Sequence, residues 1–276
     1  MIQILDDLNK KMEQSVMKNE SDYIKNGLLY CGKCNTAKQC EVEILNQKKK
    51  FYCLCKCETI KRDNEIKRQE ELEEIRRIER LKTQGLQDKE ALNWNFEKAE
   101  SNKYIEKAKI YCNNWNEMYK NNIGLIFWGD VGTGKTYVAG CIANYLLDKK
   151  IPVLMTNFSK IINDMMGFKI SNKNEYLEEL NRYKLLIIDD LGAERQSEFA
   201  LEQVFSIIDN RYKNGQPIII TTNLSLQEIK EPSNITYKRI YDRVLEMCTP
   251  MKFIGESKRR LQASKKIENL KKMMEG

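Results

Sequence analysis

The chain has 276 residues, of which 41% are hydrophobic and 32% charged, and its formal net charge is +7. It contains no histidine, which excludes catalysis by histidine and metal binding through imidazole, whereas the charge is compatible with a polyanionic partner. No apolar run approaches the roughly 20 residues of a membrane-spanning helix, and the first residues lack the pattern of a signal peptide, so we expect a cytoplasmic protein with no membrane partner.

The first predicted element is an amphipathic helix within residues 1–27. Its apolar side chains recur at spacings of three and four: Ile4, Leu5, Leu8, Met12 and Val16. Two interpretations remain open, because such a helix can pack on the segment that follows it or dock a partner protein.

Residues 28–60 contain a cysteine cluster that predicts a zinc-binding module. Cys31 and Cys34 form a C-x-x-C pair, and Cys53, Cys55 and Cys57 follow as a second group. Four thiolates satisfy Zn²⁺, and the metal would supply the folding free energy that so short a segment lacks. We predict Cys31, Cys34, Cys55 and Cys57 as ligands, with Cys53 as the substitute. Reduced buried thiols and an iron–sulfur cluster are the alternatives.

Residues 61–92 predict a charged helical linker between two domains. Charged residues of both signs dominate from Glu58 to Lys82, and the apolar residues are too sparse for a core face or a sustained heptad. Gly85 marks the predicted end of this helix.

The domain over residues 93–276 begins with a predicted helix, 99–119, and contains a phosphate-binding loop. Gly129–Thr136 fits the template G-x-x-x-x-G-K-[ST] at every position, between a predicted strand at 123–128 and a predicted helix at 137–147. We expect Lys135 to reach the β- and γ-phosphates of ATP and the Thr136 hydroxyl to bind Mg²⁺. The other loop residues, which would surround the phosphates, are Gly129, Asp130, Val131, Gly132, Thr133 and Gly134.

A second motif, made of acidic residues, follows a predicted buried apolar run at 183–188. Asp189 at its carboxyl end can hold Mg²⁺ directly or through water, and Asp190 is positioned to polarise an attacking water molecule. The remaining predicted strands and helices are residues 151–156, 160–167 (with Ser159 as its cap), 199–212 and 217–222.

Three polar positions complete the candidate site. Asn223 ends a predicted strand, and Arg239 and Arg243 stand four residues apart on one helix face. An arginine can neutralise transition-state charge in a neighbouring subunit, although an ion pair with Asp242 or Glu246 would explain Arg243 equally well. The polar tail from 263 onward is expected to be frayed.

In this order the motifs resemble those of replicative-helicase loaders of the DnaC/DnaI type, the IstB-like branch of AAA+ ATPases. The resemblance covers about residues 93–262 and rests on Gly129–Thr136, Leu185–Arg195, Ile219–Leu224, Arg239–Arg243 and Gly255–Arg259. It implies an α/β fold, a parallel sheet with helices on both faces, preceded by a zinc module like those of phage-encoded members.

The resemblance also implies roles for single residues. Asn223 resembles sensor 1, which detects the γ-phosphate and orients water, and Arg259 resembles sensor 2. Arg243 resembles the arginine finger, and Arg239 a supporting interface arginine. Asp190 stands where many AAA+ ATPases have Glu, which implies slow turnover.

The implied function is that of an ATP-dependent loader. Such proteins associate through their ATPase domains on a hexameric replicative helicase and help transfer it to single-stranded DNA. Residues 1–60 would dock on the helicase, and basic residues of the ATPase domain would contact DNA phosphates. Two alternatives remain open: a transposition helper ATPase that binds duplex DNA and a transposase, and an adaptor that binds ATP with little hydrolysis.

Overall fold

The computed structural model describes residues 19–44, 47–166, 173–192, 197–232 and 234–275. The chain divides between Arg76 and Arg77 into two compact units. The predicted helix within residues 1–27 falls mainly on residues 1–18, which lie outside the described residues, as does the end of the acidic motif at 193–196.

Two short antiparallel ribbons form the N-terminal unit together with the start of a long helix. Their strands are β1 (Tyr23–Lys25), β2 (Leu28–Tyr30), β3 (Gln39–Ile44) and β4 (Gln47–Tyr52). The β1–β2 hairpin crosses the predicted boundary at residue 28, because three-residue strands are too short for a periodic signal. Asn26 and Gly27 at its turn both have positive φ, and Asn-Gly is the sequence signal of such a hairpin.

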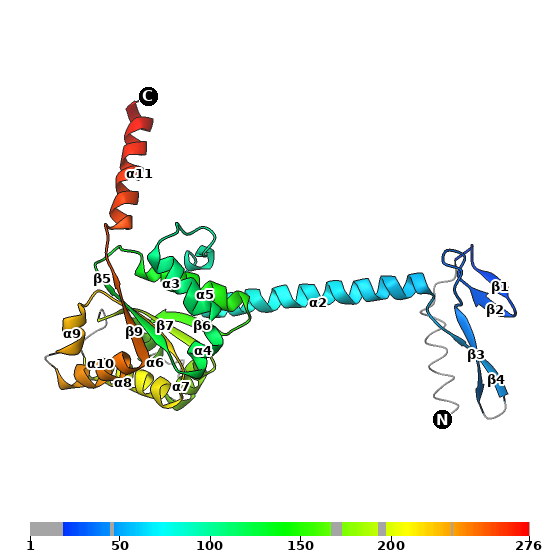
Figure 1. The fold of residues 1–276 in the computed structure, drawn as a ribbon, viewed down its shortest axis with the longest axis horizontal. Coiled ribbons are helices and arrows are strands. Elements are labelled where there is room, and N and C mark those ends of the chain that lie inside the picture. The colour runs from blue at the N-terminus through cyan, green and yellow to red at the C-terminus, as the bar shows by residue number, and fades with distance from the viewer. Residues whose placement is uncertain (1–18, 45–46, 167–172, 193–196, 233, 276) are drawn as a thin grey trace. The chain divides into compact units, whose positions relative to one another are not determined.

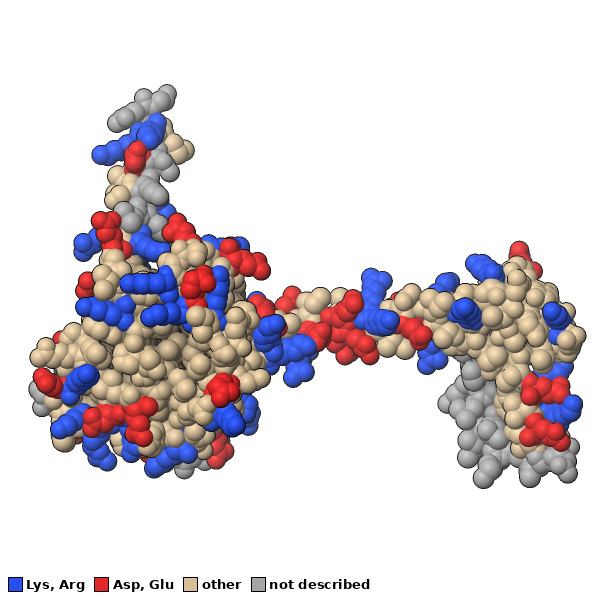
Figure 2. Space-filling view, viewed as in Figure 1, with Lys and Arg blue, Asp and Glu red and all other residues tan. Residues whose placement is uncertain are grey.

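Helix α2 (Lys56–Gly85) is the charged helix that the sequence predicts, and it ends at the predicted glycine. Side chains of both signs follow its length (Figure 2). A Cβ atom at Gly85 would lie 2.1 Å from the backbone oxygen of Val153, so the close approach of this helix end to the sheet requires glycine. Lys82 Nζ also pairs with Asp148 Oδ1 at 2.7 Å, which fixes the last turn on the C-terminal unit.

The C-terminal unit contains a parallel five-stranded sheet in the order β6-β7-β8-β5-β9. Its strands are β5 (Gly124–Gly129), β6 (Val153–Asn157), β7 (Leu185–Leu191), β8 (Ile218–Thr222) and β9 (Cys248–Phe253). The predicted parallel sheet is therefore confirmed. The sequence did not predict β9, because Pro250 argues against a strand. This proline is tolerated because β9 lies at the edge of the sheet, where one side of the strand has no partner among the described strands.

Helices cover both faces of the sheet (Figure 1). Leu125 and Phe127 of β5 pack in a core with α3 and α5, whereas Ile126 packs in a second core with α6, α8 and α10. This alternation explains why the strands are continuous apolar runs, since both of their faces are buried. The helices are α3 (Lys103–Asn113), α4 (Trp115–Lys120), α5 (Lys135–Asp148), α6 (Phe158–Met166), α7 (Lys173–Asn181), α8 (Glu198–Lys213), α9 (Leu226–Lys230), α10 (Ile235–Met247) and α11 (Lys258–Glu275), with a 3₁₀ turn at Ala91–Asn93.

Three local predictions were wrong. The helix predicted over 99–119 is two helices, of which the first begins after Asn102, whose side chain accepts hydrogen bonds from two backbone N–H groups. At the start of α6 the cap is Asn157, whose Oδ1 accepts from Lys160 N at 2.8 Å, rather than Ser159. The tail from Ala263 is helical within α11, because its lysines, glutamates and methionines favour helix and no glycine or proline interrupts them before 276.

Candidate nucleotide site and cysteine cluster

The loop from β5 to α5 follows a path that its glycines permit. Gly129, Gly132 and Gly134 have φ values of 129°, 83° and 97°, in the region that favours glycine. At Gly132 a Cβ atom would lie 2.1 Å from the Ser257 hydroxyl oxygen, so a larger residue would displace that segment. Val131 is exposed. The loop leads directly into the first turn of α5, whose N–H groups suit a phosphate.

Lys135 is buried within this loop. Its ammonium donates hydrogen bonds to the backbone oxygens of Gly129 and Asp130, at 2.7 and 2.9 Å, and to Asn223 Oδ1 at 2.8 Å. Burial lowers the pKa of Lys135, whereas nearby carboxylates, foremost that of Asp190, oppose this shift. The structure thus brings Lys135, the first residue of α5, into contact with Asn223, which directly follows β8.

The acidic end of β7 is organised by a threonine of β8. The Thr221 hydroxyl donates to Asp189 Oδ1 at 2.6 Å and accepts from Asp190 N at 3.0 Å. Burial raises the pKa of Asp189, whereas hydrogen bonds from the Thr221 and Thr136 hydroxyls lower it. A divalent cation would replace the hydration that burial removes from this carboxylate, so Asp189 and Thr136 fit a Mg²⁺ site.

Asp190 has an unusual backbone. Its φ of 57° lies in the left-handed region, at a register shift between β7 and β8. Aspartate is enriched in this region relative to longer side chains. The local backbone therefore favours Asp over Glu at this position.

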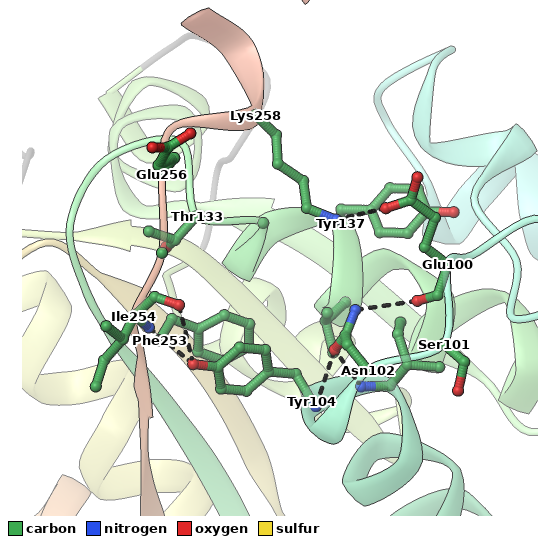
Figure 3. A pocket seen from close by; sticks show the side chains of 14 residues that line it. Glu100, Ser101, Asn102, Tyr104, Thr133, Tyr137, Phe253, Ile254, Glu256 and Lys258 are labelled. Carbon is green, nitrogen blue, oxygen red and sulfur yellow. Dashed lines mark hydrogen bonds and ion pairs between the residues drawn. The ribbon is translucent and has the colours of Figure 1, made fainter. Parts of the chain in front are cut away.

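A cavity of about 370 Å³ adjoins the loop (Figure 3). Its lining comes from the start of α3, the loop with the first turn of α5, and the segment between β9 and α11. The Tyr104 hydroxyl accepts from Ile254 N at 2.8 Å and donates to Ile254 O at 3.3 Å, and Lys258 Nζ faces a Glu100 carboxylate oxygen at 3.8 Å. Aromatic and apolar walls next to Thr133 of the loop suit a nucleobase.

Basic residues at the start of α11 also reach the loop. Lys258 N donates to Gly132 O at 2.9 Å. Burial is the main cause of the pKa shifts of Lys135 and Asp189, and the charge of Arg259 acts on both groups as a smaller contribution.

Residues after α2 line a second cavity of about 200 Å³ whose wall includes Thr136 and Asp189. Gln87 and Asp88 belong to this lining, and Gln87 Oε1 accepts a hydrogen bond from the Thr156 hydroxyl at 3.1 Å. Both residues fall within the predicted linker at 61–92. No motif marks them, because only the fold places them beside the acidic motif.

Arg239 and Arg243 lie on another surface, between α10 and α8. Their guanidinium carbons are 4.9 and 5.4 Å from the centroid of the Phe205 ring. Arg243 Nη2 is also 2.7 Å from Asp209 Oδ1, an ion pair that the sequence did not suggest.

The four predicted thiols converge in the N-terminal unit. All their sulfur atoms lie within 4.8 Å of one another: Cys31, Cys34, Cys55 and Cys57. Cys57 Sγ is 3.2 Å from that of Cys55 and 3.6 Å from that of Cys31. Four sulfurs at about 2.3 Å from a tetrahedral zinc lie about 3.8 Å apart, so this spacing fits the metal. Cys53 Sγ instead donates to a backbone oxygen.

The environment of the thiols also favours a cation. Burial raises the pKa of the Cys55 thiol, whereas a hydrogen bond with the Thr36 hydroxyl lowers the pKa of Cys34 to about 5. A buried thiol beside a thiolate ionises readily only when a cation offsets the charge, which is what a bound metal supplies.

A buried lysine connects the ribbons to α2. Lys38 Nζ lies 2.8 Å from Asp22 Oδ2 and 3.1 Å from Glu58 Oε1, and its side chain is fully buried. Although burial alone would lower it, the pKa of Lys38 is raised by these two carboxylates. Glu58 also accepts a hydrogen bond from Cys55 N, which ties this ion pair to the cysteine cluster.

Comparison with known proteins identifies the family. The model of the IstB-like ATP binding protein family matches residues 36–266, most of the chain. The chain belongs to this family.

Curated relatives of this IstB-like protein include two replicative helicase loaders. DnaI of Bacillus subtilis is 27% identical over 163 residues, which cover 54% of this chain and 51% of DnaI. DnaC of Escherichia coli K12 is 30% identical over 144 residues, or 51% of this chain and 56% of DnaC. The chain thus matches a little over half the length of each, and the predicted resemblance to DnaC/DnaI-type proteins is confirmed.

Solved structures agree on the fold of the IstB-like domain. A crystal structure of DnaI has a TM-score of 0.53 at 21% identity, covering 64% of this chain and 98% of that one. A crystal structure of the DnaC helicase loader has a TM-score of 0.50 at 24% identity, covering 60% and 100%. The AAA+ P-loop fold predicted from the sequence is confirmed. Within the described residues, no helix is both long and apolar enough to span a membrane.

Proposed function

We propose that this protein is an ATP-dependent loader that binds the hexameric replicative DNA helicase and helps place it on single-stranded DNA in the bacterial cytoplasm. The observation that carries the proposal is the hydrogen bond between Lys135 and Asn223, which lies beside the Asp189–Thr221 hydrogen bond. The relatives of the chain that are replicative helicase loaders support it further. The two arginines on a separate surface support a site that a second copy completes.

The proposed reaction is hydrolysis of ATP to ADP and phosphate. Lys135 and the loop N–H groups bind the phosphates, and Thr136 and Asp189 hold Mg²⁺, which when bound neutralises phosphate charge. Asp190 and Asn223 position a water molecule whose oxygen attacks the γ-phosphorus while the bond to the bridging β-phosphate oxygen breaks. The adenine base of ATP occupies the cavity beside Tyr104.

Assembly controls this reaction. Arg243 of a neighbouring copy neutralises the charge that develops on the γ-phosphate, and Arg239 supports the same interface. Arg259 acts within its own chain, near Lys135 and Asp189. Hydrolysis is therefore slow in the isolated chain and depends on neighbouring ATPase domains.

The two units have separate tasks in this proposal. Cys31, Cys34, Cys55 and Cys57 bind Zn²⁺ and give residues 28–60 the fixed shape that, with residues 1–27, docks on the helicase. Basic side chains of the ATPase domain at 93–276 bind single-stranded DNA, and Lys and Arg gather at the base of α11 on the face in Figure 2.

The proposal is tested by mixing the protein with the replicative helicase of its bacterial host, with and without ATP, and measuring the mass of any complex. We expect an ATP-dependent assembly on the helicase ring that the Lys135→Ala variant does not form. Absence of a complex under conditions where ATP binds would contradict the loader function.

One alternative, a transposition helper ATPase, would share the same IstB-like domain. That protein would prefer duplex over single-stranded DNA, so the ratio of the two affinities distinguishes it from a loader. Turnover above background that is lost in Asp190→Asn would exclude the second alternative, an adaptor with little hydrolysis.

A further inference from the structure

We propose that Asp209, together with the rings of Phe205 and Tyr212, positions Arg243 for insertion into the ATP site of a neighbouring copy. We call these three residues of α8 the arginine cradle. The inference rests on the proposed function, and it adds a positioning residue that none of the sequence motifs contains.

The ion pair is the first observation. Arg243 Nη2 lies 2.7 Å from Asp209 Oδ1, and the side chains are 28% and 15% exposed. The second carboxylate oxygen of Asp209 pairs with Lys213 Nζ at 2.8 Å. Lys213 is itself 69% exposed and so contributes little to fixing Asp209, whereas Arg243 is partly accessible to a neighbouring molecule.

The aromatic rings are the second observation. The guanidinium carbon of Arg243 is 5.4 Å from the centroid of Phe205 and 5.0 Å from that of Tyr212, within cation–π range of both. The Tyr212 hydroxyl donates to Glu246 Oε1 at 2.7 Å, which fixes that ring. Arg239 shares Phe205 at 4.9 Å, so one ring orders both arginines.

Helical spacing makes the cradle a single surface. Positions 205, 209 and 212 follow one another by four and three residues on α8, and positions 239 and 243 are four apart on α10, so each set lies on one helix face. The two helices pack against each other throughout this region.

The cradle reduces the conformational entropy that Arg243 loses when it inserts into a neighbouring site. A free arginine side chain loses rotamer entropy when it is fixed, and a side chain already held by an ion pair and two rings has lost most of that entropy. A guanidinium has five N–H donors, which one carboxylate cannot all engage, so donors remain for phosphate oxygens. Asp209 therefore orients Arg243 and still leaves some of its N–H donors free to bind phosphate oxygens.

The test uses mixed assemblies on the helicase ring in the presence of ATP. Copies with Lys135→Ala bind no ATP and do not assemble alone, but they supply Arg243 and join the ring through the ATP of a neighbouring copy. Copies with Arg243→Ala bind ATP but supply no arginine. Each variant alone should be nearly inactive, and the mixture should recover hydrolysis where the two kinds of copy meet.

Asp209→Asn is then added to one kind of copy at a time. In the Lys135→Ala copies, which donate the arginine, we expect it to lower the recovered kcat about tenfold or more with the KM for ATP unchanged. In the Arg243→Ala copies it should change the recovered rate less than twofold. Lys213→Ala in the donating copies is the matched control, because it removes the other partner of Asp209 and should leave the rate unchanged. Thermal melting checks that each variant folds.

Three outcomes would overturn the inference. An unchanged rate with Asp209→Asn in the donating copies would show that Arg243 needs no cradle. A higher rate would show that Asp209 sequesters the arginine. Equal losses in both kinds of copy would indicate a structural role only. Failure of the parent mixture to recover hydrolysis, with both variants folded and both present in the mixed assembly, would instead contradict the arginine in trans and hence the proposed mechanism itself.

Discussion

At the scale of single residues, the candidate site depends on hydroxyl groups as much as on its acids. Thr221 contacts both acidic residues of β7, one through its donor and the other through its acceptor. The neighbouring Thr222 is equally buried, but its hydroxyl donates to the backbone oxygen of Leu191 at 2.7 Å. Two adjacent threonines of one strand therefore have different tasks, and substitutions can separate them.

Thr221→Val should weaken Mg²⁺-dependent ATP binding about tenfold, because Asp189 loses the donor that orients its carboxylate. Isothermal titration with and without Mg²⁺ measures this. Thr222→Val is the matched control, since it removes a buried hydroxyl from the same strand and should lower thermal stability while leaving the affinity for ATP within about twofold. Equal affinity losses in the two variants would contradict the role given to Thr221.

Lys135→Ala should abolish ATP binding, because it removes the charge that faces the phosphates. Arg243→Ala should bind ATP normally and reduce turnover in the assembled state about a hundredfold or more, as loss of an arginine finger does. Equilibrium binding of a fluorescent ATP analogue and phosphate release on the helicase ring are the two measurements. Loss of nucleotide binding in Arg243→Ala would show that this arginine serves its own chain.

The sequence predicts those site residues whose chemistry is tied to local spacing. Lys135, Asp189 and Asn223 each follow a recognisable strand, and parallel strands bring their carboxyl ends to one edge of a sheet. Tyr104 and Asp209 were missed because their partners, Ile254 and Arg243, are remote in sequence and carry no shared motif. Such contacts depend on how helices pack, which periodicity does not specify.

At the scale of elements, the N-terminal ribbons depend on a few buried contacts, because strands this short enclose little apolar surface. The Asp22–Lys38–Glu58 ion pairs connect the first ribbon, the segment before β3 and the first turn of α2. The cysteine cluster spans the same elements. The sequence predicted the thiols from their spacing, but a buried lysine has no signal, since most lysines are exposed.

Lys38→Met should strongly destabilise the N-terminal unit, because it leaves two carboxylates near the cluster without their cation. The expected result is faster zinc release to a chromogenic chelator and a lower melting temperature for that unit. Lys48→Met is the control, since its pair with Glu41 is exposed, with 71% and 39% of the two side chains accessible, and should matter little. Similar zinc release from both variants would contradict the bracing role of Lys38.

At the scale of the whole molecule, the two units are stabilised by different physics. The C-terminal unit buries two apolar cores, one on each face of a five-stranded sheet. The N-terminal unit has two-stranded ribbons and four converging thiols, so its folding free energy should come largely from the metal. A treatment that acts only on the metal should therefore destabilise the N-terminal unit without affecting ATP binding by the C-terminal unit.

Removal of zinc by a chelator under reducing conditions should unfold the N-terminal ribbons and leave the C-terminal unit folded. Calorimetry should lose one transition and keep the other, and the affinity for ATP should stay within about twofold, because Lys135 and Asp189 belong to the unaffected core. Binding to the helicase should fall sharply, since residues 1–60 dock there in the proposed function. Cys31→Ser should reproduce the loss, whereas Cys40→Ser, outside the cluster, should not. Loss of ATP affinity on zinc removal would contradict this division, because it would make the metal a support of the nucleotide site.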